Sequence, residues 1–133
     1  MRVFLDTNVL VSAFATRGVC SDVLRVALTE HTLVTSEVVL RELSRVLRVR
    51  IKLPPRIVDE IDAFLRENEV TPMPAAPSGL PIRDKDDRWV LASAIEGRAD
   101  VMVTGDRDLL DVADKAPIQI VDPRGFWQLV RQS

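Results

Sequence analysis

The sequence is dominated by an alternation between short apolar runs and longer stretches with helical spacing. The runs are rich in apolar and β-branched residues and occupy residues 3–5, 32–35, 101–104 and 118–121. Such runs are typical of strands that are buried on both faces, and strands that alternate with helices favour right-handed crossovers. We therefore predict an α/β fold in which a mostly parallel central sheet of about four to five strands lies between helices, in three layers.

The helices are predicted from apolar spacing and from residues that begin helices. They occupy residues 9–15, 22–29, 37–49, 57–68, 89–96 and a last stretch from 123 onward. Ser21 and Ser36 are predicted to cap the second and third of them, and Asp122 followed by Pro123 begins the last. Segment 71–82 holds four prolines and a glycine, so it is predicted to be an irregular connection inside one domain that spans residues 1–133.

Two aspartates follow strands that lie far apart in the sequence. Asp6 ends the first predicted strand, and Asp106 lies just past the third. In a parallel sheet the carboxyl ends of the strands share one edge, and ligands bind there. The alternative for either residue alone is a polar turn at the end of a strand.

Glu42 occupies an unusual position in the helix predicted over residues 37–49. Val38 and Val39 precede it by four and three positions and Val46 follows by four, so it interrupts the apolar stripe. A carboxylate that points to the interior needs a cation, a metal or a proton. The alternatives are an arginine partner or a stripe rotated far enough to leave Glu42 at its hydrated margin.

A third acidic group precedes the helix predicted over residues 89–96. Asp84, Asp86 and Asp87 lie in one short segment, and one of them is expected to cap the helix. Ala92 and Ala94 give this helix small side chains, which allow its first turn to pack close to the sheet edge. The sequence alone leaves the choice among the three aspartates open.

Acidic oxygens without histidine or cysteine form a set of hard ligands. Such a set suits Mg²⁺ or Mn²⁺ and does not suit zinc. Bound ions of this kind polarise a phosphate and lower the pKa of a water that attacks phosphorus. Histidine-based cleavage of RNA is not expected, because His31 is the only histidine and precedes a predicted strand, outside the acidic set.

The overall composition gives few signs of a partner. The formal net charge is only -2 at pH 7, so a nucleic acid would have to meet a local patch. The single cysteine, Cys20, forms no internal disulfide, which favours a reducing, cytoplasmic setting. The N-terminus lacks the pattern of a signal peptide, and the uncharged stretch 7–16 is too short to span a bilayer, so no membrane is expected.

Several of these features together resemble the PIN domain family, over essentially the whole chain. They are Asp6-Thr7-Asn8 after the first strand, Glu42 in a mid-chain helix, Asp87 at the start of an alanine-bearing helix, and Val103-Thr104-Gly105-Asp106 after a strand. The resemblance is closest to PIN proteins related to VapC, the toxin components of toxin–antitoxin systems. It implies a parallel sheet between helices, an acidic pocket for one or two Mg²⁺ or Mn²⁺ ions, and endonucleolytic cleavage of RNA.

The resemblance also implies a role for each matching residue. Its metal-binding and catalytic acids correspond to Asp6, Glu42, Asp87 and Asp106. Asn8 and Thr104 would orient the carboxylates or a bound water. Asp84 is a rival or additional third acid, because Arg88 stands where a small residue often follows, and Asp108 is a second choice for the fourth. The family further implies an antitoxin protein as a partner and a homodimer.

A row of basic residues accompanies Glu42 and gives a candidate surface for RNA or for an acidic antitoxin segment. Arg41, Arg45, Arg48 and Lys52 recur at helical spacing. The alternative is a solvated face whose charges suit the C-terminal end of a helix. With few aromatic residues and no tyrosine, the sequence does not locate a surface for stacking bases.

Three other classes of protein fit the sequence less well. A PIN scaffold that binds RNA or protein without catalysis would be expected to lack some of the four acids, and all four are present. A phosphoacceptor receiver domain has paired acids after its first strand and a lysine after a late strand, whereas Asp6 stands alone here and no lysine follows residues 118–121. A haloacid-dehalogenase-type phosphatase would have aspartate where Asn8 stands.

Overall fold

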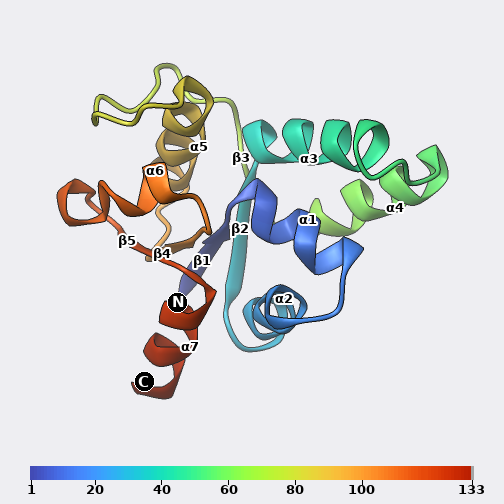
Figure 1. Cartoon of the computed structure of the whole chain (residues 1–133), viewed down its shortest axis with the longest axis horizontal. Helices are drawn as coiled ribbons and strands as arrows, with labels where there is room; N and C mark the ends of the chain where they lie inside the picture. The colour runs from blue at the N-terminus through green and yellow to red at the C-terminus, as the bar shows by residue number, and fades with distance from the viewer. Residues whose placement is uncertain (133) are drawn as a thin grey trace.

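The computed structural model describes residues 1–132 and contains a sheet of five strands that all run parallel (Figure 1). The strands lie in the order β3-β2-β1-β4-β5. Their bounds are β1 Arg2–Leu5, β2 Thr32–Ser36, β3 Glu69–Thr71, β4 Val101–Val103 and β5 Gln119–Val121. The prediction of an α/β fold with a mostly parallel sheet of four to five strands is confirmed.

Helices cover both faces of the sheet (Figure 1). Helices α1 to α4 lie on one side, and α5 and α6 lie on the other. The bounds of the helices are α1 Thr7–Ala15, α2 Val19–Glu30, α3 Glu37–Val49, α4 Pro55–Leu65, α5 Lys85–Glu96, α6 Arg107–Leu110 and α7 Pro123–Gln132, with a short 3₁₀ helix at Ala113–Lys115. The three layers α/β/α follow from this arrangement.

The chain reverses its direction across the sheet between β1 and β4. From β1 it moves outward through β2 to β3 at one edge, and it then returns to β4, which pairs with the other side of β1. Right-handed crossovers therefore place the helices of the two halves on opposite faces. Ligands bind at such a reversal, in the crevice beyond the carboxyl ends of the two strands. The topology thus marks the ends of β1 and β4.

The central strands form the core because neighbours on both sides and helices on both faces cover them. Val3, Phe4 and Leu5 are at most 1% exposed, as are all three residues of β4. Val3 is in register with Val101 and Leu5 with Val103, so β1 and β4 end side by side. Rigid packing of this kind holds whatever follows the two strands at a fixed separation.

Helix α3 begins at the predicted residue, but its buried stripe is rotated relative to the apolar stripe read from the sequence. The Ser36 hydroxyl accepts a hydrogen bond from the Val39 amide at 3.2 Å and caps the helix, as predicted. The fully buried stripe is Val39, Leu40, Leu43, Val46 and Leu47. Glu42 lies at the margin of this stripe and is partly exposed, so the structure agrees with the alternative of a rotated stripe that leaves Glu42 at its hydrated margin. Val38 is itself only half-buried, and the stripe is rotated away from it.

Other departures from the predicted elements have local causes. Helix α2 begins at Val19, before Ser21, whose hydroxyl instead donates to the carbonyl oxygens of Ala13 and Thr16. Ser21 is therefore not a cap, and its hydrogen bonds link the first turn of α2 to the end of α1. Lys52 lies beyond the end of α3 in a left-handed backbone conformation, φ 63°, so it does not continue the basic row.

Three short elements were not expected from the sequence, and one of them is the 3₁₀ helix at Ala113–Lys115. Strand β3 takes up Thr71, the first residue of the segment predicted to be irregular, while the rest of that segment has no regular structure. Helix α6 forms a single turn directly after Asp106. The strand order also differs from that of receiver domains, in which β1 lies between β2 and β3. The receiver alternative is therefore not supported.

Candidate metal centre

Asp6 is held at the carboxyl end of β1 by both of its carboxylate oxygens. It caps α1, and its Oδ1 accepts a hydrogen bond from the Thr7 amide at 2.8 Å. Its Oδ2 accepts one from the Thr104 hydroxyl at 2.7 Å. The Asp6 side chain is 3% exposed. Two hydrogen-bond donors therefore fix a carboxylate that water hardly reaches, beside the strand ends where the chain reverses its direction across the sheet.

Asp106 lies beside Asp6 because the same threonine contacts both. The Asp106 amide donates to the Thr104 hydroxyl oxygen at 3.0 Å, while that hydroxyl donates to Asp6. Asp106 then caps α6, and its Oδ1 accepts from the Asp108 amide at 2.9 Å. The positions of Asp6 and Asp106 at one edge of the sheet are as predicted from strand ends, and Thr104 links them.

Of the three aspartates at the start of α5, the structure brings Asp87 to the other acids. One carboxylate oxygen from each of Asp87, Asp106 and Asp108 lies within 4.8 Å of the other two. Asp87 is 8% exposed, and its Oδ2 is buried without a hydrogen-bond partner. Asp84 is an exposed cap of α5 that accepts from the Asp86 amide at 2.9 Å. Asp84 therefore caps α5, while Asp87 forms a carboxylate cluster with Asp106 and Asp108.

The crowding of carboxylates raises two pKa values. Burial raises the pKa of Asp6 to about 6, against the two hydrogen bonds from Thr104 and Thr7, and the charges of Glu42 and Asp106 add to the rise. The pKa of Asp87 is also raised, to about 8. Burial is the largest cause, the adjacent carboxyl of Asp106 is the second, and the charges of Asp106, Asp6 and Asp84 add to the rise. A cation bound beside either carboxyl would stabilise its charged form and lower its pKa.

These residues fit a divalent cation by their chemistry. The cluster offers only carboxylate oxygens, and one of them, Asp87 Oδ2, is buried without a partner. A buried acceptor in that condition is costly unless it binds a proton or a cation. Hard oxygen ligands match Mg²⁺ or Mn²⁺. Arg83 reaches Asp108 at 3.3 Å from a side chain that is 89% exposed, and so does not replace an ion at Asp87.

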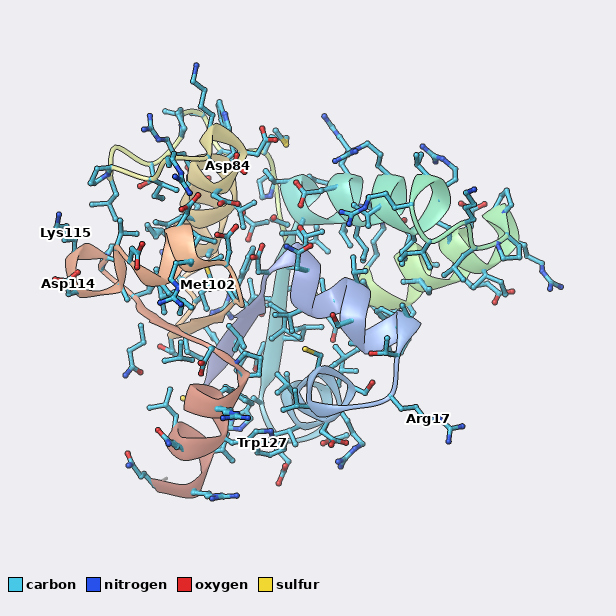
Figure 2. The ribbon with its side chains drawn as sticks, viewed as in Figure 1. Arg17, Asp84, Met102, Asp114, Lys115 and Trp127 are labelled. Atoms are coloured by element: carbon cyan, nitrogen blue, oxygen red, sulfur yellow. The ribbon has the colours of Figure 1, made fainter. Side chains whose placement is uncertain are left out.

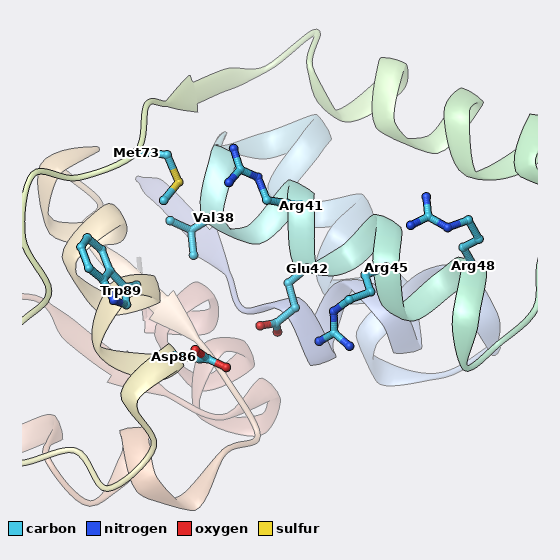
Figure 3. A pocket seen from close by; sticks show the side chains of 8 residues that line it. All are labelled: Val38, Arg41, Glu42, Arg45, Arg48, Met73, Asp86 and Trp89. Carbon is cyan, nitrogen blue, oxygen red and sulfur yellow. The ribbon is translucent and has the colours of Figure 1, made fainter.

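Glu42 lines a pocket between α3 and α5. The pocket has a volume of about 460 Å³. Its lining residues are Val38, Arg41, Glu42, Arg45, Arg48, Met73, Asp86 and Trp89. Figure 3 shows the carboxylates of Glu42 and Asp86 pointing toward each other from the two helices. Glu42 is close enough to affect the charge state of Asp6, although it lies outside the tight group around Asp87.

Of the remaining residues that the sequence singled out, Asn8 lies close to Asp6 in the chain and His31 lies at the other end of the sheet. Asn8 is exposed on the first turn of α1, two residues after Asp6. His31 lies at the amino end of β2, where its Nδ1 is 3.2 Å from the Met1 amino group and its ring packs edge-on against Phe126. It is therefore outside the acidic site, as expected, although it is half-buried.

Three residues near the site were not identified from the sequence. Thr7 is buried, and its hydroxyl oxygen has no hydrogen-bond partner beside Asp6. Met73 and Trp89 line the pocket that Glu42 faces. Thr7 stands in the quoted Asp6-Thr7-Asn8 motif, which was a usable signal. Met73 lies in the irregular segment and carried no signal, because only the tertiary fold brings it to α5.

The comparison with protein families gives one match. The sequence model of the PIN domain family matches residues 2–108, a range that includes Asp6, Glu42, Asp87 and Asp106. No curated protein matches the chain significantly.

Solved structures share the fold at low sequence identity. A chain in the structure of VapBC2 from Rickettsia felis bound to a DNA fragment from their promoter is 20% identical, with a TM-score of 0.63, and the match covers 92% of this chain and 98% of that one. A chain of VapBC-1 from nontypeable Haemophilus influenzae is 19% identical, also with a TM-score of 0.63, and the match covers 93% of this chain and 99% of that one. These similarities cover nearly the whole sheet and its helices.

Proposed function

This chain belongs to the PIN domain family, and on that premise we propose that it is a metal-dependent endoribonuclease that hydrolyses phosphodiester bonds of RNA. The observation that carries the proposal is Asp87. Its carboxylate is buried against Asp106 and Asp108, one oxygen lacks a partner, and its pKa is raised to about 8. Arg83 pairs only with Asp108 at the edge of this group, so the crowding of Asp87 against Asp106 supports a cation-binding role more than a purely structural one.

Each residue has a role in this proposal. Asp87, Asp106 and Asp6 would hold Mg²⁺ or Mn²⁺, with Asp108 as an additional ligand. Glu42 would contribute a carboxylate from α3, and Thr104 fixes the orientation of Asp6. When bound, the ion would polarise a phosphate oxygen and lower the pKa of a bound water. Asn8 and Asp84 are proposed to make supporting polar contacts at the rim.

The biological setting is a second part of the proposal. Chains of similar fold occur in the VapBC2 and VapBC-1 structures, so we propose that this protein is the toxin of a toxin–antitoxin pair in the cytoplasm. Its partners would be RNA, an antitoxin protein and a second copy of the chain. No helix within residues 1–132 is long and apolar enough to cross a membrane.

The activity is tested with purified protein and a labelled single-stranded RNA, with Mn²⁺, with Mg²⁺ and with EDTA. We expect cleavage only with the metals and a loss of cleavage in Asp6→Asn. Because water is the proposed nucleophile, the products should carry no 2′,3′-cyclic phosphate, which attack by the neighbouring 2′-hydroxyl would leave. Cleavage that survives both EDTA and Asp6→Asn would overturn the proposal, and metal-independent RNA binding without cleavage would favour the non-catalytic scaffold.

The toxin role needs a separate test, since an active nuclease need not be a toxin. Expression of the wild-type chain in a bacterial host is expected to arrest growth, and the Asp106→Asn variant is expected to be harmless at the same protein level. Co-expression of a small protein encoded beside it should restore growth. Harmless expression of a protein that cleaves RNA in vitro would contradict the toxin role and leave the nuclease intact.

A further inference from the structure

The pocket between α3 and α5 contains an apolar surface that the acidic centre lacks. Trp89 on α5, Met73 on the segment after β3 and Val38 on α3 lie together on one side of it (Figure 3). Met73 is 46% exposed, and Trp89 and Val38 are half-buried. An indole and a thioether that are open to solvent at one site form a flat, polarisable surface, which suits stacking of a planar group.

Unpaired cations line the same pocket. Arg41, Arg45 and Arg48 are exposed on α3, and none of them forms an ion pair or a hydrogen bond with another residue of the described range 1–132. By contrast, Arg66 on the neighbouring face is held by Glu37 at 2.6 Å and Asp62 at 2.8 Å. These guanidinium groups are therefore available to a ligand, although the carboxylates of Glu42 and Asp86 line the same pocket.

The pocket adjoins the acidic centre directly. Asp86 lines it and precedes Asp87 in the chain, and Glu42 faces it from α3. Its volume of about 460 Å³ lies within the range of roughly 300–1,000 Å³ that is usual for small-molecule sites. A nucleotide next to a phosphate at the acidic centre would therefore lie at this pocket.

We propose that the pocket is a nucleobase subsite. One base of a single-stranded RNA, next to the bond that is cut, stacks on Trp89 beside Met73, while Arg41 and Arg45 bind the adjoining phosphates. This inference rests on the proposed nuclease function and specifies that the RNA substrate is single-stranded at the bond that is cut. A duplex hides the faces of its bases, whereas a single strand exposes them and every base has a π-face to offer. An acidic peptide would pair with the arginines but would leave the indole without a planar partner.

The stacking is tested by fluorescence of Trp89. Trp127, the other tryptophan, lies on α7 at the opposite end of the molecule from Asp84 (Figure 2). In the Trp127→Phe variant Trp89 is the only indole, so its emission reports on the pocket. We expect a ten-nucleotide single-stranded RNA in EDTA to quench this emission to saturation, and an abasic ribose-phosphate oligomer of the same length to leave it unchanged. Absent quenching, or equal quenching by both oligomers, would overturn the subsite.

Binding affinities provide an independent measurement. Trp89→Ala should weaken binding of the same RNA by about five- to a hundredfold, while Trp89→Phe should keep most of the affinity, because a base stacks on phenylalanine as well. Arg41→Gln and Arg45→Gln should each lower the slope of log affinity against log salt by about 0.7. Unchanged affinity in Trp89→Ala, with the fold verified by circular dichroism, contradicts the proposal. So does an acidic peptide that quenches Trp89 when RNA does not.

The failure of this inference and the failure of the nuclease function are distinguishable. Binding is measured in EDTA, and cleavage is measured with Mn²⁺. Cleavage without quenching would remove the subsite and leave the nuclease. Quenching by RNA but not by the abasic oligomer, without cleavage under any metal, would leave a base-binding pocket on a protein that does not hydrolyse RNA.

Discussion

At the scale of single residues, the Thr104 hydroxyl has a central position because it joins the two strand ends. It donates to Asp6 and accepts from the Asp106 amide. The hydrogen bond to Asp6 opposes the effect of burial on the pKa of that carboxyl. Thr104 therefore keeps Asp6 easier to ionise, and an ionised Asp6 is what a cation needs.

Replacement of this threonine by its near-isostere tests that role. Thr104→Val should raise the pKa of Asp6 above about 6 and so weaken Mn²⁺ binding near neutral pH. The loss of a hydrogen bond to a charged group is worth about 1.5–3 kcal/mol, which sets the scale of the effect on affinity. Isothermal titration with Mn²⁺ measures it, and Thr104→Ser is the control that keeps the hydroxyl. Equal affinity of the valine and serine variants would refute this role.

The raised pKa of Asp87 predicts how stability depends on pH in the metal-free protein. The pKa rises from 3.8 to about 8 in the folded state, so between these values the folded protein binds more protons than the unfolded chain. The free energy of unfolding must therefore fall as the pH rises from about 4 through 8. Asp6 adds to the same fall up to about pH 6.

Urea unfolding in EDTA at pH 5 to 9 measures this dependence. The wild type should lose stability across the range, and Asp87→Asn should lose less and should be the more stable protein at pH 8. The difference between the two proteins isolates Asp87 from other titrating groups. A stability that stays constant or rises between pH 5 and 8 in the wild type would contradict the account.

At the scale of elements, the sheet depends on close packing between the end of α5 and the strands β2 and β3. A Cβ on Gly97 would lie 2.5 Å from Thr71 Oγ1 and 2.9 Å from Val34 Cγ1. Gly97 ends the helix that carries Asp87. The absence of a side chain therefore lets α5 lie against the sheet.

Gly97→Ala is accordingly expected to destabilise the protein. Overpacking of this kind typically costs about 1–3 kcal/mol, and urea unfolding would show the loss as a lower midpoint. Gly79→Ala is the matched control, because nothing lies within 4 Å of the position of its Cβ. If both variants unfold at the same urea concentration, the packing described for α5 is wrong.

The elements that were predicted correctly are those whose signals are local. Strands 3–5 and 101–104 are buried runs, and the cap at Ser36 needs only its own helix. Strand β3 was missed because Glu69–Thr71 contains a single apolar residue and so forms no apolar run. Ser21 was misassigned because its hydroxyl bonds backward to α1, a contact between two elements that a propensity does not contain.

The site shows the same division. Asp6 and Asp106 were predictable from strand ends, because a parallel sheet fixes where its carboxyl ends meet. Glu42 was selected for a misfit in an apolar stripe whose phase was wrong, since the buried face is set by what α3 packs against. The sequence did not separate Asp87 from Asp84 and Asp86. Only the structure shows which one faces Asp106.

At the scale of the whole molecule, the acids belong to segments that folding alone brings together. The chain reverses across the sheet at β1 and β4 and delivers Asp6, Asp106 and, from α5, Asp87 to one edge. A cation that binds there links these segments and stabilises only the folded state. Mn²⁺ should therefore raise the melting temperature of the wild type by several degrees.

A thermal scan with and without Mn²⁺ checks this coupling. The shift should disappear in Asp106→Asn and persist in Asp114→Asn, which removes an exposed acid on the 3₁₀ helix outside the cluster (Figure 2). An equal shift in both variants would mean that Mn²⁺ binds elsewhere on the surface.

The single-turnover rate of single-stranded RNA cleavage against Mn²⁺ concentration depends most directly on the proposed role of Asp87 as a metal ligand. Wild type and Asp114→Asn should show a rate that is absent in EDTA and saturates with Mn²⁺. Asp87→Asn should be slower by about a hundredfold or more at every concentration, the scale on which one preorganised electrostatic group acts in an active site. An Asp87→Asn protein that cleaves with the wild-type rate and Mn²⁺ dependence would contradict the central claim.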